Sequence, residues 1–386
     1  MSQALIALLK RADPASTIHV LAPLATAAIA ERMPGVERVF LMPTRHGEFG
    51  LAKRWSMARH LRREGYSQAL VLPNSWKSAL VPFLAGIPHR TGWRGELRYG
   101  LLNDLRVLDE DTYPRMVDRF MALGLPAEVI PEQVPQARSE PEPDIEREPE
   151  SEPEQCLWLV DWKGPYRPEL RVEAKIQEES GAPGHRLDAL FQRLGLDASN
   201  RQLSSPCIAL CPGAEFGPAK RWPVQHYAAV ADWCLEMGAR VWMLGSESDK
   251  ALAGAIVEHL LSPEWDRLSN LCGKTDLLDV IDLIALTDVV VTNDSGLMHV
   301  ACAVGVPVVA IYGSTSPEFT PPLGRACVVT RSLTCQPCFA RDCPLGHFDC
   351  LNGLLPEPVI QGIRRFLAAD SITEGIPPSS CRRSSV

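Results

Sequence analysis

Short apolar runs alternate with helical patterns through the first third of the chain. The runs IHVLA (18–22), RVFLM (38–42) and ALVLP (69–73) are bounded by breaker residues, as buried parallel strands are. Between them lie helical patterns over residues 25–32, 51–64 and 78–85. This regular succession predicts an α/β sheet with helices on both faces.

The same alternation returns in the second half. CIALC begins a strand–loop–helix unit at residue 207, RVWML begins another at residue 240, and DVVVT and VVAIY enclose a third helix. This pattern is typical of a doubly wound sheet. Because 386 residues are too many for one ordinary core, we predict two Rossmann-like domains around a central cleft, 1–130 and 186–355, then a terminal helix 356–370 and a disordered tail 371–386.

A segment rich in Pro and Glu separates the two halves. Residues 139–155 read SEPEPDIEREPESEPEQ, in which Ile145 is the only large aliphatic residue. Such a stretch cannot bury enough apolar surface to offset the entropy lost on ordering. We therefore predict that residues 131–185 form a disordered acidic insert between the domains.

Composition narrows the function classes. With 47 acidic and 39 basic residues the net charge is -8, which argues against non-specific nucleic-acid binding. The sequence has no apolar run long enough to span a membrane and no secretory signal at its start, so we expect a cytoplasmic protein in a reducing compartment. Most of the twelve cysteines lie in apolar runs and are expected to pack as small hydrophobes.

The loop PGAEFGPAKRWP (212–223) is the strongest candidate site. It follows a predicted strand and contains Gly213 and Gly217, which allow close approach of the backbone. Lys220 and Arg221 precede Pro223, a residue suited to the first position of a helix. A helix N-terminus beside two cations favours an anion, and a diphosphate is the natural ligand.

Two further loops follow predicted strands. In TNDSGLMHVACA (292–303), Asp294 or Ser295 could cap a helix, while Gly296 admits a ligand and His299 projects from the first turn. In GSESD (245–249), Glu247 could accept hydrogen bonds from ribose or sugar hydroxyls, and a helix N-cap is the competing interpretation. We predict ligand roles for His299 and Glu247.

A basic loop in the first half suggests an anionic second ligand. Residues 74–104 contain Lys77, Arg90, Arg94 and Arg98 among aromatic residues and glycines. Arginine is suited to bidentate recognition of phosphate and carboxylate. In a chain of net negative charge, this concentration predicts an acceptor-binding loop, and a merely solvated basic loop is the alternative.

Four cysteines near the end of the second half share a loop with the spacing C-x2-C-x4-C-x6-C. They are Cys335, Cys338, Cys343 and Cys350. Four thiolates suit tetrahedral zinc, although this is not the paired CxxC spacing of a zinc ribbon. The sequence allows two interpretations of this cluster, a structural zinc site and simple packing of the thiols.

These motifs together resemble the ADP-heptose:lipopolysaccharide heptosyltransferases, glycosyltransferase family 9, and most closely the heptosyltransferase II members. The resemblance rests on VLPNSWKSALVPFLAGIPHRTGWRGELRYGLLND, CPGAEFGPAKRWP, and VTNDSGLMHVACA followed by YGSTSPEFTPPL. It extends from Met1 to about residue 331, without the acidic insert.

The resemblance implies a GT-B fold and inverting transfer of L-glycero-D-manno-heptose from ADP-heptose to the first heptose of the lipopolysaccharide inner core. It implies no required cofactor and, because the acceptor is membrane-embedded, peripheral contact with the inner membrane. It assigns Lys220 to the diphosphate, Glu247 to the ribose, and the diphosphate and sugar to Asp294, Ser295, Gly296, Leu297 and His299. The acceptor would lie on the N-terminal domain.

In one respect the sequence departs from the family. Its members open with a strand and a turn ending in Gly-Asp, whose aspartate is the expected base, whereas MSQALIALLK matches the helix after that turn. Asp13 lies at the far end of this helix and cannot replace the base. We therefore expect the first strand and the base to lie upstream of Met1, and a truncated, inactive protein is the alternative.

Two other enzyme classes fit the sequence less well. Nucleotide-sugar epimerases use a similar two-domain fold, but would not need the basic loop of residues 74–104. A nicotinamide dehydrogenase is disfavoured because no G-x-G-x-x-G follows a predicted strand.

Overall fold

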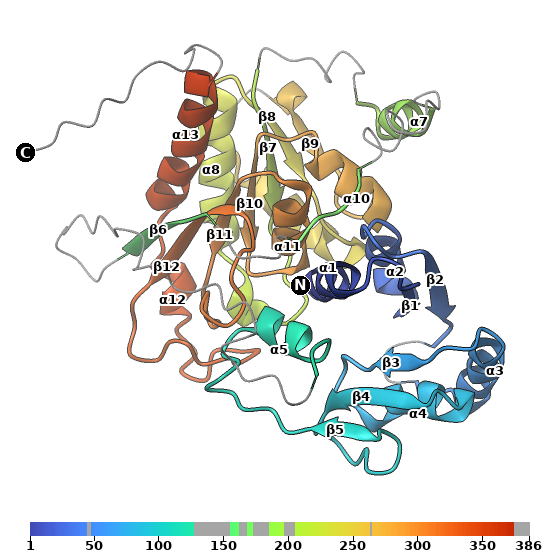
Figure 1. Ribbon diagram of the computed structural model, residues 1–386. Coiled ribbons are helices and arrows are strands. Elements are labelled where there is room, and N and C mark those ends of the chain that lie inside the picture. Colours follow the sequence, from blue (N-terminus) through green and yellow to red (C-terminus); the bar gives the residue numbers. More distant parts are fainter. Residues whose placement is uncertain are drawn as a thin grey trace, which may run out of the picture.

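The computed structural model describes residues 1–44, 48–126, 155–161, 168–172, 185–196, 205–262 and 265–373 (Figure 1). In the second half, seven strands form one sheet in the order β6-β12-β11-β10-β7-β8-β9. The strands are β7 (Cys207–Cys211), β8 (Arg240–Met243), β9 (Leu268–Asn270), β10 (Val289–Asn293), β11 (Val308–Ile311), β12 (Arg325–Arg331) and β6 (Gln155–Asp161). All pairs are parallel except β12 with β6.

Helices cover both faces of this sheet, as predicted. On one face, residues of α8 (Val224–Glu236), α9 (Lys250–Glu258) and α13 (Pro356–Thr373) share a buried core with the strands. On the other face the core includes α7 (His185–Leu194), α10 (Leu277–Ile284) and α11 (Gly296–Val304). Figure 1 shows α8 and α13 on one side of the strands and α10 on the other. The predicted α/β class of this half is confirmed.

Strand β6 corrects the predicted extent of the acidic insert. Gln155–Asp161 pairs antiparallel with β12 along seven residues, although we predicted disorder over residues 131–185. The reason lies in CLWLV (156–160), an apolar run that the Pro/Glu-rich flanks concealed. Residues 131–154, which carry most of the acidic sequence, lie outside the described residues.

The first half contains two small parallel sheets rather than the single sheet that we predicted. One contains β1 (His19–Pro23) and β2 (Arg38–Met42), and the other β3 (Gln68–Leu70), β4 (His89–Trp93) and β5 (Asp104–Arg106). The helices of this half are α1 (Ser2–Ala12), α2 (Leu24–Glu31), α3 (Leu51–Arg62), α4 (Trp76–Ala85) and α5 (Met116–Ala122).

The division falls at a definite place in the Rossmann strand order. In that order, 3-2-1-4-5-6, the first strand lies between the second and the fourth. If β1 and β2 are the second and third strands, and β3 to β5 the last three, the gap between the two sheets is the position of the first strand. Within the described residues β1 pairs only with β2, and β3 only with β4.

A buried ion pair joins the two halves. Arg32, just after α2, donates to the Asp282 carboxylate of α10 over 2.9 Å, and both side chains are almost fully buried. Ile6, Met33 and Val36 also belong to the core that contains α10 and α11. The beginning of the chain therefore packs against the second half.

The remaining elements are short or terminal. Three 3-10 turns, η3 (Pro218–Lys220), η4 (Glu247–Asp249) and η5 (Trp265–Arg267), precede helices or strands, and α12 (Asp349–Asn352) precedes α13. Helix α13 extends to Thr373, three residues beyond the predicted end. Among the helices described, none is both long and apolar enough to cross a bilayer.

Candidate functional site

The strand order of the large sheet places its switch point between β7 and β10. The chain proceeds from β7 outwards through β8 to β9, and then from β10 outwards through β11 to β12. Ligands of open α/β sheets bind outside the carboxyl ends of the strands at such a point. The loops that follow β7 and β10 are the two predicted ligand loops, 212–223 and 292–303, so the structure brings them together.

Asn293, the last residue of β10, ties these two loops together. Its side-chain amide donates to the carbonyl of Pro212 over 2.7 Å and accepts from the backbone N–H of Trp222 over 3.2 Å. The side chain is fully buried. Because both ends of the 212–223 loop are bonded to one strand end, the loop has a fixed position relative to β10.

Close packing explains both glycines of the loop. A Cβ on Gly213 would lie 2.6 Å from the carboxylate of Asp249, and one on Gly217 would lie 2.4 Å from the carbonyl oxygen of Arg341. Residues Pro218–Lys220 form the turn η3, and α8 begins at Val224 with Pro223 as its N-cap, one position before the predicted one. The loop is thus packed between the 245–249 segment and the loop around Arg341.

Lys220 lies beside a buried carboxylate at the switch point. Its Nζ donates to Asp294 Oδ2 over 2.7 Å, and the two side chains are 14% and 5% exposed. The same carboxylate accepts hydrogen bonds from the hydroxyls of Thr315, over 2.6 Å, and Thr320, over 3.3 Å. Asp294 therefore orients the ammonium group of Lys220 rather than capping α11.

The start of α11 is open. Ser295 is its N-cap residue but makes no side-chain capping bond, and its hydroxyl lies 3.1 Å from that of Thr292. Gly296 is exposed, and a Cβ there would meet no atom within 4 Å. Leu297 is partly buried against the core. A helix N-terminus without a side-chain cap, next to a lysine, is suited to binding an anion.

His299 projects from the first turn of α11 with an unsatisfied ring nitrogen. Its Nδ1 is buried and has no hydrogen-bond partner among the described residues. Burial lowers its pKa to about 4, the amino group of Met1 and Lys220 also lower it, and Asp294 opposes them. Burial likewise lowers the pKa of the Met1 amino group to about 6. The imidazole is therefore neutral at pH 7, with a polar atom available to a ligand.

Glu247 lies at the rim of the same region. It begins η4, is largely exposed, and pairs with Lys250 over 2.8 Å. The helix N-cap that competed with a ligand role for this motif is Ser246, which forms a capping box with Asp249. The helix-cap interpretation therefore applies to Ser246, and the Glu247 carboxylate remains accessible.

Two of the four predicted acceptor-binding residues serve the loop itself. Arg98 is fully buried and donates to the carbonyls of Pro73, over 2.6 Å, and Trp93. Arg90 donates to the carbonyls of Leu101, over 2.7 Å, and Ile87. Their guanidinium groups hold the backbone of the 74–104 segment, and a contact of these two arginines with the acceptor stays a prediction.

Lys77 and Arg94 differ from them. Arg94 is exposed and Lys77 is half-buried, and no ion pair or hydrogen bond of either side chain is seen within the described part of the chain. The neighbouring Leu97 and Tyr99 are 82% and 67% exposed. The loop thus presents apolar and cationic side chains together.

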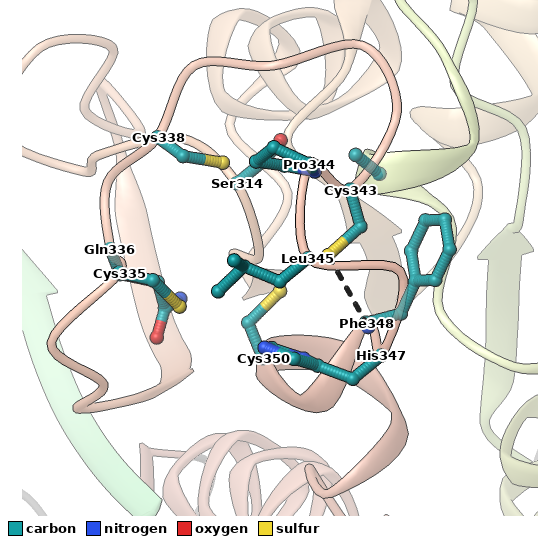
Figure 2. A pocket seen from close by; sticks show the side chains of 11 residues that line it. Ser314, Cys335, Gln336, Cys338, Cys343, Pro344, Leu345, His347, Phe348 and Cys350 are labelled. Carbon is teal, nitrogen blue, oxygen red and sulfur yellow. Dashed lines mark hydrogen bonds between the residues drawn. The ribbon is translucent and has the colours of Figure 1, made fainter.

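The four cysteines of the 335–350 loop line one small pocket (Figure 2). The side chains of ten cysteines are described, and all ten have free thiols. The backbone N–H of Phe348 donates to the sulfur of Cys343 over 3.5 Å, and this bond is the main cause of the lowered pKa of Cys343. Burial raises the pKa of Cys350 to about 11. As they stand, no three or more His, Cys, Asp or Glu side chains in the described ranges are spaced to hold a metal ion.

Sequence reasoning missed the residues that support the ligand loops. Thr315 and Thr320 bond the Asp294 carboxylate, and Asn293 fixes the 212–223 loop. The first two lie in the motif YGSTSPEFTPPL, which carried the resemblance but suggested no site. Clustered threonines after a predicted strand were the available signal.

Comparisons with known proteins agree with this geometry. The family model described as glycosyltransferase family 9 (heptosyltransferase) matches residues 54–349. Lipopolysaccharide heptosyltransferase 2 of Salmonella typhimurium is 39% identical, with 96% of each chain covered. Lipooligosaccharide heptosyltransferase 2 of Haemophilus influenzae is 38% identical, with 95% of each covered. The solved structure of Escherichia coli ADP-heptose lps heptosyltransferase II is similar, with a TM-score of 0.74, 36% identity, and 96% of this chain and 95% of that chain covered.

The fold and the switch-point site define a two-domain α/β transferase of the GT-B type. The chain belongs to glycosyltransferase family 9, the heptosyltransferases.

Proposed function

We propose that this protein transfers L-glycero-D-manno-heptose from ADP-heptose to the first heptose of the lipopolysaccharide inner core, with inversion at the anomeric carbon. The observation that carries the proposal is the cluster at the switch point. There a buried carboxylate orients Lys220 beside the open start of α11. The likeness to heptosyltransferases 2 over nearly the whole chain supports the choice of donor and acceptor.

In this proposal the donor lies along the carboxyl ends of β7, β8 and β10. Lys220 and the first amides of α11 contact the diphosphate, Gly296 gives it room, and Ser295 and Leu297 line the same approach. The unsatisfied Nδ1 of His299 bonds the diphosphate or the sugar. Glu247, at the end of β8, accepts from the ribose hydroxyls.

Electrostatic stabilisation of the leaving group is the main chemical contribution of these residues. As the bond to the heptose breaks, negative charge collects on ADP. A preorganised cation and helix amides stabilise such charge most strongly where water is excluded. Lys220 is already oriented by Asp294, so little reorganisation is needed when the charge develops.

The acceptor lies on the first half. We assign its phosphates to Lys77 and Arg94, whose cationic groups are not engaged with the loop itself. Leu97 and Tyr99, exposed on the same loop, are suited to peripheral contact with the cytoplasmic face of the inner membrane. A cytoplasmic enzyme acting on a lipid-anchored acceptor requires a surface of this kind.

The acceptor hydroxyl must lose a proton to a general base. The carboxylates assigned above orient Lys220 or bond the ribose, so we assign the role of base to neither Asp294 nor Glu247.

The reaction proposed here assigns no chemical step to a metal. We propose that zinc at Cys335, Cys338, Cys343 and Cys350, if bound, has a structural role.

The test is heptose transfer from ADP-heptose to a mono-heptosylated core acceptor, with Lys220→Ala as the comparison. We expect transfer with inverted stereochemistry by the wild type and a large loss of activity in the variant. Equal activity of both proteins would contradict the proposed donor site. Turnover of the nucleotide sugar without acceptor would favour the epimerase alternative.

A further inference from the structure

The loop that contains the four cysteines packs directly on the loop that contains Lys220. The backbone N–H of Ala219 donates to the carbonyl of Arg341 over 3.0 Å. In return, the Arg341 guanidinium donates to the carbonyl of Phe216 over 2.6 Å and lies over its ring. Gly217 leaves the space that the Arg341 carbonyl fills. Arg341, which lies between Cys338 and Cys343, thus holds the 216–219 segment that leads to Lys220.

A second set of contacts joins the cysteine loop to the end of β11. Phe339 N–H donates to the carbonyl of Ser314 over 2.8 Å, and the Gln336 side chain donates to the carbonyl of Gly313 over 2.6 Å. Ser314 and Gly313 immediately precede Thr315, which bonds the Asp294 carboxylate. The cysteine loop therefore contacts the loop of Lys220 directly, and it is linked to Asp294 through the 313–315 segment, whose Thr315 bonds the carboxylate.

The pocket inside the cysteine loop has the chemistry of a ligand site. Cys335, Cys338, Cys343 and Cys350 all line it, and Figure 2 shows the four side chains around one space. Ser314 also lines it. Its side chain is 1% exposed, and its Oγ has no hydrogen-bond partner among the described residues. A buried hydroxyl without a partner costs free energy unless something bonds it.

The backbone around Cys343 is shaped to stabilise a thiolate. The N–H of Phe348 points at the Cys343 sulfur, and Gly346, between them, has a φ of +74°, in the left-handed region. His347 also lines the pocket, but its Nδ1 accepts from the N–H of Asp349 over 2.9 Å. The cysteines, rather than this histidine nitrogen, are then the available donors.

We propose that Cys335, Cys338, Cys343 and Cys350 bind one thiophilic divalent cation in a tetrahedral thiolate site, and that this cation holds the 335–350 loop against the donor loop. Because the four thiols line the pocket but are too widely spaced to coordinate one ion as they stand, binding requires their sulfur atoms to move closer together. Zinc is the probe cation, since four sulfurs suit its tetrahedral preference. The second part of the proposal rests on the proposed function, because it concerns affinity for the donor.

The first experiment measures the metal itself. The full chain is purified, and its zinc is measured by elemental analysis, beside Cys338→Ser, Cys335→Ser/Cys343→Ser and the control Cys234→Ala. Cys234, on α8, is buried in the core and does not line the pocket. We expect about one zinc per wild-type chain and per control chain, and loss of it in both pocket variants.

A spectroscopic measurement keeps the result independent of folding and activity. Cobalt(II) added to metal-free wild type is expected to give the absorption bands of a tetrahedral thiolate site, and zinc to abolish them. Four thiols should also become reactive when the metal is removed. Absence of zinc, of cobalt bands and of any change in thiol reactivity would overturn the proposal.

The second experiment measures how the metal affects the donor loop. Calorimetric titration with ADP is compared for zinc-loaded and zinc-free protein, and for Cys338→Ser. We expect ADP to bind about fivefold or more weakly without zinc, in the range of ordinary coupling between sites. Zinc binding with unchanged ADP affinity would overturn the link to the donor loop. Failure of both forms to bind ADP would instead count against the proposed donor site.

Discussion

The two halves of the molecule hold their basic residues in opposite ways. At the switch point of the large sheet, Lys220 is fixed by a buried carboxylate at the ligand side. In the loop of the first half, Arg98 is buried even more completely, yet its guanidinium faces the backbone of its own loop. Arg94 lies on the same loop but is exposed, and its guanidinium bonds no backbone carbonyl among the described residues.

The difference shows that a cluster of basic residues is not by itself a ligand site. In the proposed site, Asp294 orients the ammonium group of Lys220 and leaves it able to bond a ligand. Arg90 and Arg98 instead support the fold, because their N–H groups donate to carbonyl groups of the backbone in and beside their own loop. Substitutions on the two sides should therefore have different consequences.

The largest effect is expected for Lys220→Ala. It removes the cation that stabilises the leaving ADP and leaves the Asp294 carboxylate buried without its charged partner. We expect kcat/KM for heptose transfer to fall about 100- to 1,000-fold, as when one preorganised donor is lost. Steady-state kinetics of heptose transfer, with circular dichroism to verify folding, measures this. A loss below threefold in a folded variant would contradict the assignment.

Arg98→Ala should act on stability rather than on chemistry. Removing the guanidinium leaves the carbonyls of Pro73 and Trp93 without their donor in a buried place. We expect a loss of about 2–3 kcal/mol in the free energy of unfolding. Urea denaturation measures it, with Arg94→Ala as the matched control, for which we expect almost no loss. Equal stabilities of the two variants would remove the contrast drawn above.

Arg94→Ala should instead weaken the acceptor. If Arg94 contacts an acceptor phosphate, its loss is expected to raise the KM for the acceptor about tenfold, the equivalent of one charge-assisted hydrogen bond. The KM for ADP-heptose should not change. Kinetics with each substrate varied in turn separates the two. A change confined to the KM for ADP-heptose would show that Arg94 contacts the donor and not the acceptor.

His299 should make stability depend on pH. Its pKa is lowered to about 4 in the folded protein, below the ordinary value of 6.5, so the unfolded chain binds more protons between these values. Stability is therefore full above pH 6.5 and is lost as pH falls toward 4. In the wild type we expect the free energy of unfolding to fall by on the order of 1 kcal/mol across this interval. His299→Gln should not show this fall, and urea midpoints at pH 7, 5.5 and 4.5 measure the difference. Parallel curves for both proteins would show that His299 does not titrate this way.

Glu247→Gln should have the smallest effect. The side chain is exposed, so its hydrogen bonds to a ribose compete with water. We expect ADP to bind about threefold more weakly, within the usual worth of one such bond. The control is Glu258→Gln, at the distant end of α9. An identical response of both variants would assign the change to general charge rather than to contact.

Much of the fold followed from periodicity. The runs at 207–211, 240–243 and 289–293 are mostly apolar and so predicted buried parallel strands, which β7, β8 and β10 are. Strand β6 was missed because five apolar residues stood inside an acidic segment, and an antiparallel edge strand needs a partner that local sequence does not reveal. The split of the first sheet likewise depends on what lies between β1 and β3.

The candidate site was predictable where loop chemistry and strand ends coincide. Gly213, Gly217 and Lys220 stood in one short loop, and the structure places that loop at the switch point, where its contact with a ligand stays a prediction. The direction in which a side chain points was not predictable, since Arg90, Arg94 and Arg98 differ only in tertiary surroundings. Thr315 and Thr320 were not predicted as residues of the site because their partner, Asp294, is twenty or more residues away in sequence.

The most direct test of the account is calorimetric titration of ADP-heptose into wild type, Lys220→Ala and Arg94→Ala. The account predicts that Lys220→Ala loses at least about tenfold in affinity, while Arg94→Ala binds as wild type does. Equal affinities of all three proteins, or a loss confined to Arg94→Ala, would contradict the claim that the donor binds at the switch point of the large sheet.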